Sequence, residues 1–124
     1  MHHGILGMKW GIKRAKEWDD IVSIWESPKY EDLYKDELFD MKDAIDDYYD
    51  NHFGDDRYFN KASKLAYDYG YKKGKAAGKD IVKKYGEQTV HEHLDDSEYR
   101  NVGPRNDAVE RFARFSAEWE RDHI

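Results

Sequence analysis

The chain contains no cysteine, which excludes disulfide bonds, a thiol nucleophile and a zinc site built from cysteines. Prolines are also few, since Pro28 and Pro104 are the only two. The longest uncharged stretch near the N-terminus, Gly4 to Met8, is too short for a signal-peptide core or a membrane span. We therefore expect a chain that is stabilised by its own packing, suits a reducing cytoplasm and does not enter a membrane.

The length and composition favour one folded domain. The 124 residues suffice for a single modest core. Charged residues make up 39% of the chain and the mean hydropathy is -1.11, values that lean toward disorder. Aromatic residues make up 15%, however, and their side chains supply burial area that disordered chains lack. The composition therefore predicts a folded domain with a heavily charged surface.

Apolar residues recur with the period of an α-helix along most of the chain. Between Trp18 and Trp25 they follow the i, i+3, i+4, i+7 spacing of one helix face. No segment alternates with the period of two that is typical of strands. We predict an all-α domain of four to five helices over residues 15–124, preceded by an extended, glycine-rich docking peptide over residues 1–14. The expected helices span 13–26, 28–52, 57–85, a short 89–96, and a last one capped by Asn106 or Asp107.

Three glycines interrupt the expected helix 57–85 at regular intervals of four residues: Gly70, Gly74 and Gly78. Each costs a helix about 1 kcal/mol relative to alanine, unless close backbone packing offsets the loss. The row is therefore predicted to form a groove of small residues for another helix. The string from Gly74 to Asp80 lacks the spacing and the Ser/Thr of a phosphate-binding loop.

The expected helix 28–52 carries a row of carboxylates opposite its apolar stripe. At a rise of about 1.5 Å per residue, the row spreads five charges over roughly 21 Å. Such a row can oppose a basic protein surface, including one that normally holds nucleic-acid phosphates, as in a DNA mimic. The alternative is an ordinary solvated helix face. The five candidate partner-binding residues are Asp36, Asp40, Asp43, Asp47 and Asp50.

The charge changes sign along the chain, from a net -10 over residues 15–60 to +6 over residues 61–86. Lysines interleaved with Tyr67, Tyr69 and Tyr71 suit contact with phosphates and stacking on bases. We favour the alternative, in which the lysines pair with the acidic helix of the same or a neighbouring subunit. Direct binding of nucleic acid is therefore not expected, whereas a homo-oligomer is compatible with the pattern. The block comprises Lys61, Lys64, Lys72, Lys73, Lys75, Lys79, Lys83 and Lys84.

The sequence offers little for catalysis or for metal binding. His91 and Asp95 are spaced to share a helix face, but the His-Glu-His at 91–93 is not the HExxH arrangement of zinc enzymes. His91 and His93 are therefore expected to be an ordinary pair of surface histidines. None of the serines stands in a recognisable catalytic context. We therefore expect no catalytic residues, no metal, no cofactor and no enzymatic activity.

The N-terminal residues 2–14 read HHGILGMKWGIKR. Their three glycines are expected to prevent a stable helix, and their apolar side chains could anchor the segment in a groove. It is predicted either to dock on a partner or to fold back on the helices of its own chain. The four expected anchors are Ile5, Leu6, Met8 and Trp10.

The segment HHGILGMKWG resembles a short N-terminal motif of tailed-bacteriophage and prophage proteins, which is commonly encoded beside head and structural genes. The resemblance covers residues 2–14 alone. It implies a phage origin and an association with the virion head, hence a location in the host bacterial cytoplasm and in the virion. Our leading hypothesis is a non-enzymatic phage structural or virion-associated accessory protein that binds a phage or host protein. The alternative is an anti-defence protein of the anti-CRISPR type that uses its acidic helix as a nucleic-acid mimic.

Overall fold

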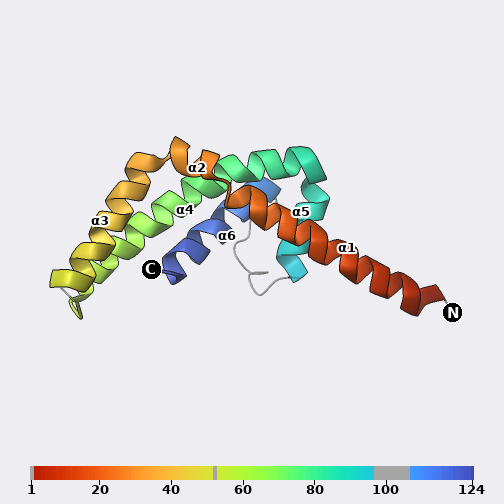
Figure 1. Cartoon of the computed structure of the whole chain (residues 1–124), viewed down its shortest axis with the longest axis horizontal. Coiled ribbons are helices and arrows are strands. Elements are labelled where there is room, and N and C mark those ends of the chain that lie inside the picture. The colour runs from red at the N-terminus through yellow and green to blue at the C-terminus, as the bar shows by residue number, and fades with distance from the viewer. Residues whose placement is uncertain (1, 52, 97–106) are drawn as a thin grey trace.

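In the computed structural model of the chain, residues 2–51, 53–96 and 107–124 are described, with side chains from Ile12 onward. Within these residues the chain forms α-helices and no strand, so the all-α prediction is confirmed. Figure 1 shows their arrangement. The helices are α1 (His2–Trp25), α2 (Pro28–Leu33), α3 (Lys35–Asn51), α4 (Asp56–Tyr85), α5 (Glu87–Asp96) and α6 (Ala108–Asp122).

The first helix begins at His2, so the expectation that the glycines would keep residues 2–14 out of a stable helix is wrong for the backbone. Helix formation is limited by its first turn, and adding residues to an existing helix is far easier. The amphipathic part of α1, residues 13–25, provides that nucleus. Each glycine still costs about 1 kcal/mol of helix stability, but the helix only has to be extended through these residues and not started there.

The expected helix over residues 28–52 is divided at Tyr34 into α2 and α3. Pro28 begins α2 at the expected position, and Ser27 precedes it without a capping hydrogen bond from its side chain, but Tyr34 has φ -121° and ψ 34°, which ends the first segment. The backbone N–H of Leu38 then bonds to the Tyr34 carbonyl oxygen at 2.9 Å, which starts the second segment. The break lets α2 and α3 take different directions along α4 (Figure 1).

The longest helix, α4, has well-defined ends. The Asp55 carboxylate accepts the backbone N–H of Arg57 at 3.0 Å, which caps its N-terminus. Gly86 ends α4 with φ 86°, a conformation that glycine adopts without a side-chain penalty. The expected cap of the last helix is present too, because Asp107 accepts the backbone N–H of Glu110 at 3.0 Å.

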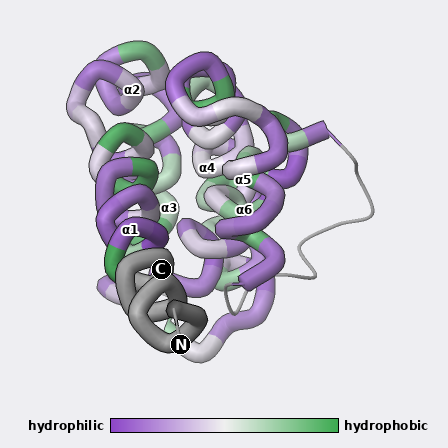
Figure 2. Tube along the Cα trace, turned by 90° about the vertical axis from the view of Figure 1, so that its right-hand side faces the viewer, coloured by the Kyte–Doolittle hydropathy of each residue, from purple (hydrophilic) through white to green (hydrophobic). Residues whose placement is uncertain are grey.

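The main core lies where α1, α2, α4, α5 and α6 meet. Trp25 is central to it, with its ring centroid 4.9 Å from that of Trp119 and 5.5 Å from that of Phe115. Figure 2 shows how the hydrophobic residues alternate with long hydrophilic stretches along the helices. A smaller cluster of Met41, Ala66 and Tyr69 joins α3 to α4. The main core contains Ile21, Trp25, Tyr30, Ala77, Ile81, Val90, Leu94, Ala108, Phe112 and Phe115.

The structure places the glycine row Gly70, Gly74 and Gly78 directly against α6. A Cβ atom on Gly74 would lie 2.5 Å from the Cβ of Ser116 and 2.9 Å from the Cα of Ala113. A Cβ on Gly70 would lie 2.7 Å from an α6 backbone atom, whereas one on Gly78 would reach no atom closer than 3.4 Å. Gly70 and Gly74 therefore let the two helix backbones approach more closely than a side chain at either position would allow, whereas Gly78 leaves room for a methyl group.

A buried lysine supports the same helix pair. Lys73 is only 5% exposed, and its ammonium group forms an ion pair with Glu120 on α6. The Lys73 Nζ atom also lies 5.2 Å from the ring centroid of Trp25 and 5.1 Å from that of Tyr69. The charge is thus held by a carboxylate and by two aromatic faces, as a desolvated cation requires. Lys73 belongs to the core and is withdrawn from the basic surface.

Candidate functional site

The acidic row lies on the outer face of α3. The opposite face is held against α4, where Met41 and Ala44 are buried. Asp47 is partly buried and accepts a hydrogen bond from Asn51 at 3.3 Å. The other four aspartates are exposed, and none of them has an ion-pair partner among the described residues: Asp36, Asp40, Asp43 and Asp50.

The lysine block neutralises this row very little. Among the described residues, one ion pair joins α3 to α4, between Glu37 and Lys72 at 3.0 Å. A backbone hydrogen bond at the start of the helix, and then Lys72, lower the pKa of Glu37. Other lysines of α4 pair with α1 and α6 instead, as in the 2.7 Å contact between Lys84 and Asp20. The expected pairing with the acidic helix thus occurs beside the aspartate row, and four members of the row, Asp36, Asp40, Asp43 and Asp50, have no ion pair with the described lysines.

Aromatic side chains are exposed beside the carboxylates. Phe39 is 69% exposed and lies on the same side of α3 as the aspartates, by its helical register. At the far end of α3, Tyr49 and Phe53 stack with ring centroids 5.8 Å apart, and Phe53 is 73% exposed. Large exposed apolar groups beside polar ones are typical of interaction surfaces. The α3 face therefore combines negative charge with aromatic contact area.

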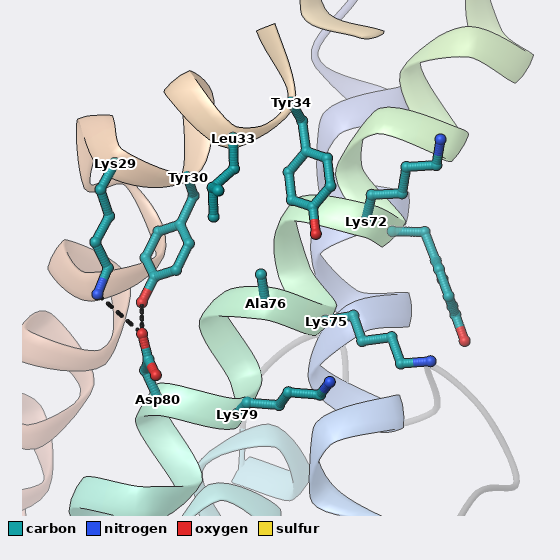
Figure 3. A pocket seen from close by; sticks show the side chains of 10 residues that line it. Lys29, Tyr30, Leu33, Tyr34, Lys72, Lys75, Ala76, Lys79 and Asp80 are labelled. Atoms are coloured by element: carbon teal, nitrogen blue, oxygen red, sulfur yellow. Dashed lines mark hydrogen bonds and ion pairs between the residues drawn. The ribbon is translucent and has the colours of Figure 1, made fainter.

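A pocket of about 750 Å³ lies between α2 and α4, on the basic side of the molecule (Figure 3). Asp80 accepts hydrogen bonds there from the Tyr30 hydroxyl at 2.6 Å and from Lys29 Nζ at 2.9 Å. These two donors, Tyr30 first, lower the pKa of the Asp80 carboxyl. The lining residues are Lys29, Tyr30, Leu33, Tyr34, Tyr71, Lys72, Lys75, Ala76, Lys79 and Asp80.

Two tyrosines of the basic block, Tyr69 and Tyr71, are engaged in contacts within the chain and do not form an exposed surface for stacking on bases. Tyr69 is buried in the core, where burial raises the pKa of its phenol. Tyr71 does line the pocket, but its hydroxyl donates to Glu110 on α6. The two tyrosines that complete the pocket, Tyr30 and Tyr34, come from α2 and from the break after it. Nothing in the local sequence signals this, because the packing of α2 on α4 is a tertiary feature.

The histidine expectation is wrong for His93. Its side chain is 6% exposed, bonds to Glu17 at 3.0 Å and stacks on Trp18 with ring centroids 5.7 Å apart. It therefore joins α5 to α1 within the fold. Among the described side chains, no three histidines or carboxylates gather in a way that could hold a metal ion. In the same part of the chain, no helix is both long and apolar enough to span a membrane.

The anchors predicted in the N-terminal motif, Ile5, Leu6, Met8 and Trp10, have side chains outside the described residues. Their backbone belongs to α1, so the motif continues into the helix that carries Trp18 and Trp25 to the core. The phage resemblance of residues 2–14 stays a prediction. Comparisons with protein-family models, with curated proteins and with solved structures find no significant match to this chain.

Proposed function

We propose that the chain is a non-enzymatic accessory protein of a tailed bacteriophage, and that the outer face of α3 docks on a basic surface of a phage or host protein. The observation that carries the proposal is the set of four exposed aspartates on α3 without ion-pair partners among the described residues. Repulsion between like charges at i, i+4 spacing destabilises a helix. A partner rich in lysine and arginine would relieve that repulsion.

The exposed Phe39 favours a protein partner over simple solvation of the helix. Its ring is 69% exposed within the acidic face, where it adds nothing to the core of its own chain. At an interface, a central aromatic residue surrounded by charges combines contact area with electrostatic complementarity. The charges raise the rate of encounter, and the ring contributes to the lifetime of the complex.

The phage assignment rests on the resemblance of HHGILGMKWG to the motif of phage and prophage proteins. Such a protein would be made in the bacterial cytoplasm and would associate with the virion head. The apolar residues of the motif, at one end of α1, would form a second docking element. Its position on a different helix from the acidic face would let one molecule contact two neighbours.

A second candidate function is anti-defence activity, in which the α3 face occupies a nucleic-acid channel of a host protein. The length of the row supports it, because five carboxylates spread over roughly 21 Å approach the charge spacing of a nucleic-acid strand. In this case duplex DNA would compete with the chain for the same partner. In the accessory role, DNA would not compete.

Mass spectrometry of purified virions tests the accessory role and separates the two candidates. We expect the chain in purified particles at a stoichiometry similar to that of other minor head proteins. Its absence from particles, together with early expression during infection, would overturn the accessory role and favour the anti-defence role. Both candidate functions would be contradicted if the chain were found in host membranes, or if it were found in infected cells without any bound protein.

A further inference from the structure

We propose that the pocket between α2 and α4 binds a small phosphorylated ligand with an aromatic body, of the nucleotide class. This site is separate from the α3 face and does not depend on the function proposed above. Its volume of about 750 Å³ lies within the range of small-molecule sites, roughly 300 to 1,000 Å³. Figure 3 shows side chains from both helices converging on it.

The charge of the lining favours an anion. Four lysines line the pocket against a single carboxylate, Asp80, which Tyr30 and Lys29 already hold. Lys79 has no ion-pair partner among the described residues, and Lys75 lies 3.8 Å from the nearest carboxylate oxygen of Glu110. Exposed ion pairs of this kind contribute little stability, so a phosphate can replace them at small cost.

The pocket has a lysine-lined end, which suits a phosphate group, and an opposite end at Asp80. Figure 3 shows the side chains of Lys75 and Lys79 extending to the same side, away from Asp80. A phosphate group would therefore lie at the Lys75 and Lys79 end, because Asp80 repels it from the other end. The Asp80 carboxylate can instead accept a hydrogen bond from a hydroxyl or amino group of the same ligand.

The aromatic body of the ligand has a matching wall. The ring of Tyr34 projects over α4 toward Ala76 in Figure 3, and Leu33 beside it is 65% exposed. The Tyr34 hydroxyl has no hydrogen-bond partner among the described residues. Its position follows from the helix break, since a continuous helix through Tyr34 would direct the side chain elsewhere. Stacking on a tyrosine beside lysines suits a nucleobase that carries a phosphate.

Titration of the full chain with ATP, adenosine and inorganic phosphate, followed by NMR chemical-shift changes, tests the proposal. We expect saturable binding of ATP with shifts centred on α2 and on residues 72–80 of α4. Adenosine, which lacks the phosphates, should bind at least tenfold more weakly, since it cannot form the charged hydrogen bonds between phosphate and the lysines. Absence of saturable ATP binding, or equal binding of adenosine, would overturn the proposal.

Two variants with equal loss of charge make the test specific. Replacing both Lys75 and Lys79 by alanine should weaken ATP binding by about tenfold or more. The control replaces Lys61 and Lys64, which are exposed on α4 outside the pocket and have no ion-pair partner among the described residues. It should leave ATP binding within about twofold of the unmodified chain. Equal loss in both variants would show non-specific attraction to the lysine block and would overturn the proposal.

Tyr34 provides an independent check of the aromatic wall. Tyr34→Ala should weaken ATP binding while leaving the weak binding of inorganic phosphate unchanged, because phosphate has no ring to stack. Far-ultraviolet circular dichroism shows whether the variant keeps its helices. If a folded Tyr34→Ala variant binds ATP as tightly as the unmodified chain, the aromatic part of the proposal is wrong.

Discussion

The glycine row allows a quantitative prediction, because its three positions differ in how much room they leave for a methyl group. In a helix, alanine is favoured over glycine by about 1 kcal/mol. At Gly74, however, the new Cβ would meet the Cβ of Ser116 at 2.5 Å and the Cα of Ala113 at 2.9 Å. Neither atom is the movable end of a side chain. Relief of the overlap therefore requires α6 to shift away from α4 by about 1 Å.

That shift would loosen the core contacts of α6, including those of the buried Phe112 and Phe115. Overpacking of this kind typically costs about 1 to 3 kcal/mol. After the propensity gain, we expect Gly74→Ala to lower the free energy of unfolding by about 1 kcal/mol, and Gly74→Leu to lower it considerably more. At Gly78, where the nearest atoms lie at 3.4 Å, alanine should be neutral or stabilising by up to about 1 kcal/mol.

Urea denaturation of both alanine variants, followed by circular dichroism, measures the difference directly. Gly78→Ala is the matched control, since both substitutions add one methyl group to the same helix. Gly74→Ala should be less stable than Gly78→Ala, because only the methyl group at position 74 overlaps α6. Equal stabilisation of the two variants would show that the α4–α6 contact yields easily, and the close approach would then have no structural role.

Three further predictions concern charge and exposure. Lys73→Ala should lower the free energy of unfolding by about 2 to 4 kcal/mol in urea denaturation, because it removes a buried side chain and leaves the carboxylate of Glu120, whose side chain is 13% exposed, without its cation; Lys79→Ala, at an exposed position, should change it by less than about 0.5 kcal/mol. Tyr30→Phe should raise the pKa of Asp80 toward its ordinary value in an NMR titration, since the Tyr30 hydroxyl is the main cause of the lowered pKa. A carboxyl with a lowered folded-state pKa adds stability that is present above pH 4 or so and is lost as the pH falls through the folded pKa, so the two proteins should converge in stability at low pH. Phe39→Ala should leave thermal stability unchanged yet reduce partner binding in a pull-down, and an unchanged pull-down would remove Phe39 from the interface.

Local signals in the sequence predicted much of the fold. The period of the apolar residues indicated the helices, and Asp107 marked the start of the last one. The register of Asp40 relative to Met41 likewise placed the carboxylates opposite the buried face. These features depend on residues close together in the chain, where the geometry of a helix alone decides the outcome.

The features that the sequence did not reveal depend on contacts between distant segments. No proline or glycine stands next to Tyr34 to mark the break. The pocket exists only because α2 packs on a part of α4 that lies fifty residues later in the chain. His93 looked like a surface residue until α1 covered it with Glu17 and Trp18. Neither spacing nor composition reports which distant helix supplies the opposite wall.

The proposed function depends on the binding of a basic protein by the exposed carboxylates of α3. It is tested by affinity capture from phage-producing cells, with quantitative mass spectrometry of the captured proteins. The test variant changes Asp40, Asp43 and Asp50 to lysine. The control reverses three exposed acids that are not part of α3, namely Asp19, Glu26 and Asp68, which alters the net charge equally.

We expect the unmodified chain and the control to capture the same basic protein, with the captured amount falling as salt rises. The α3 variant should lose that protein while keeping its helical circular dichroism spectrum. Capture of the same protein by the α3 variant at unchanged yield would contradict the proposed binding. Equal loss in the control would contradict it as well, because net charge and not the α3 face would then determine binding.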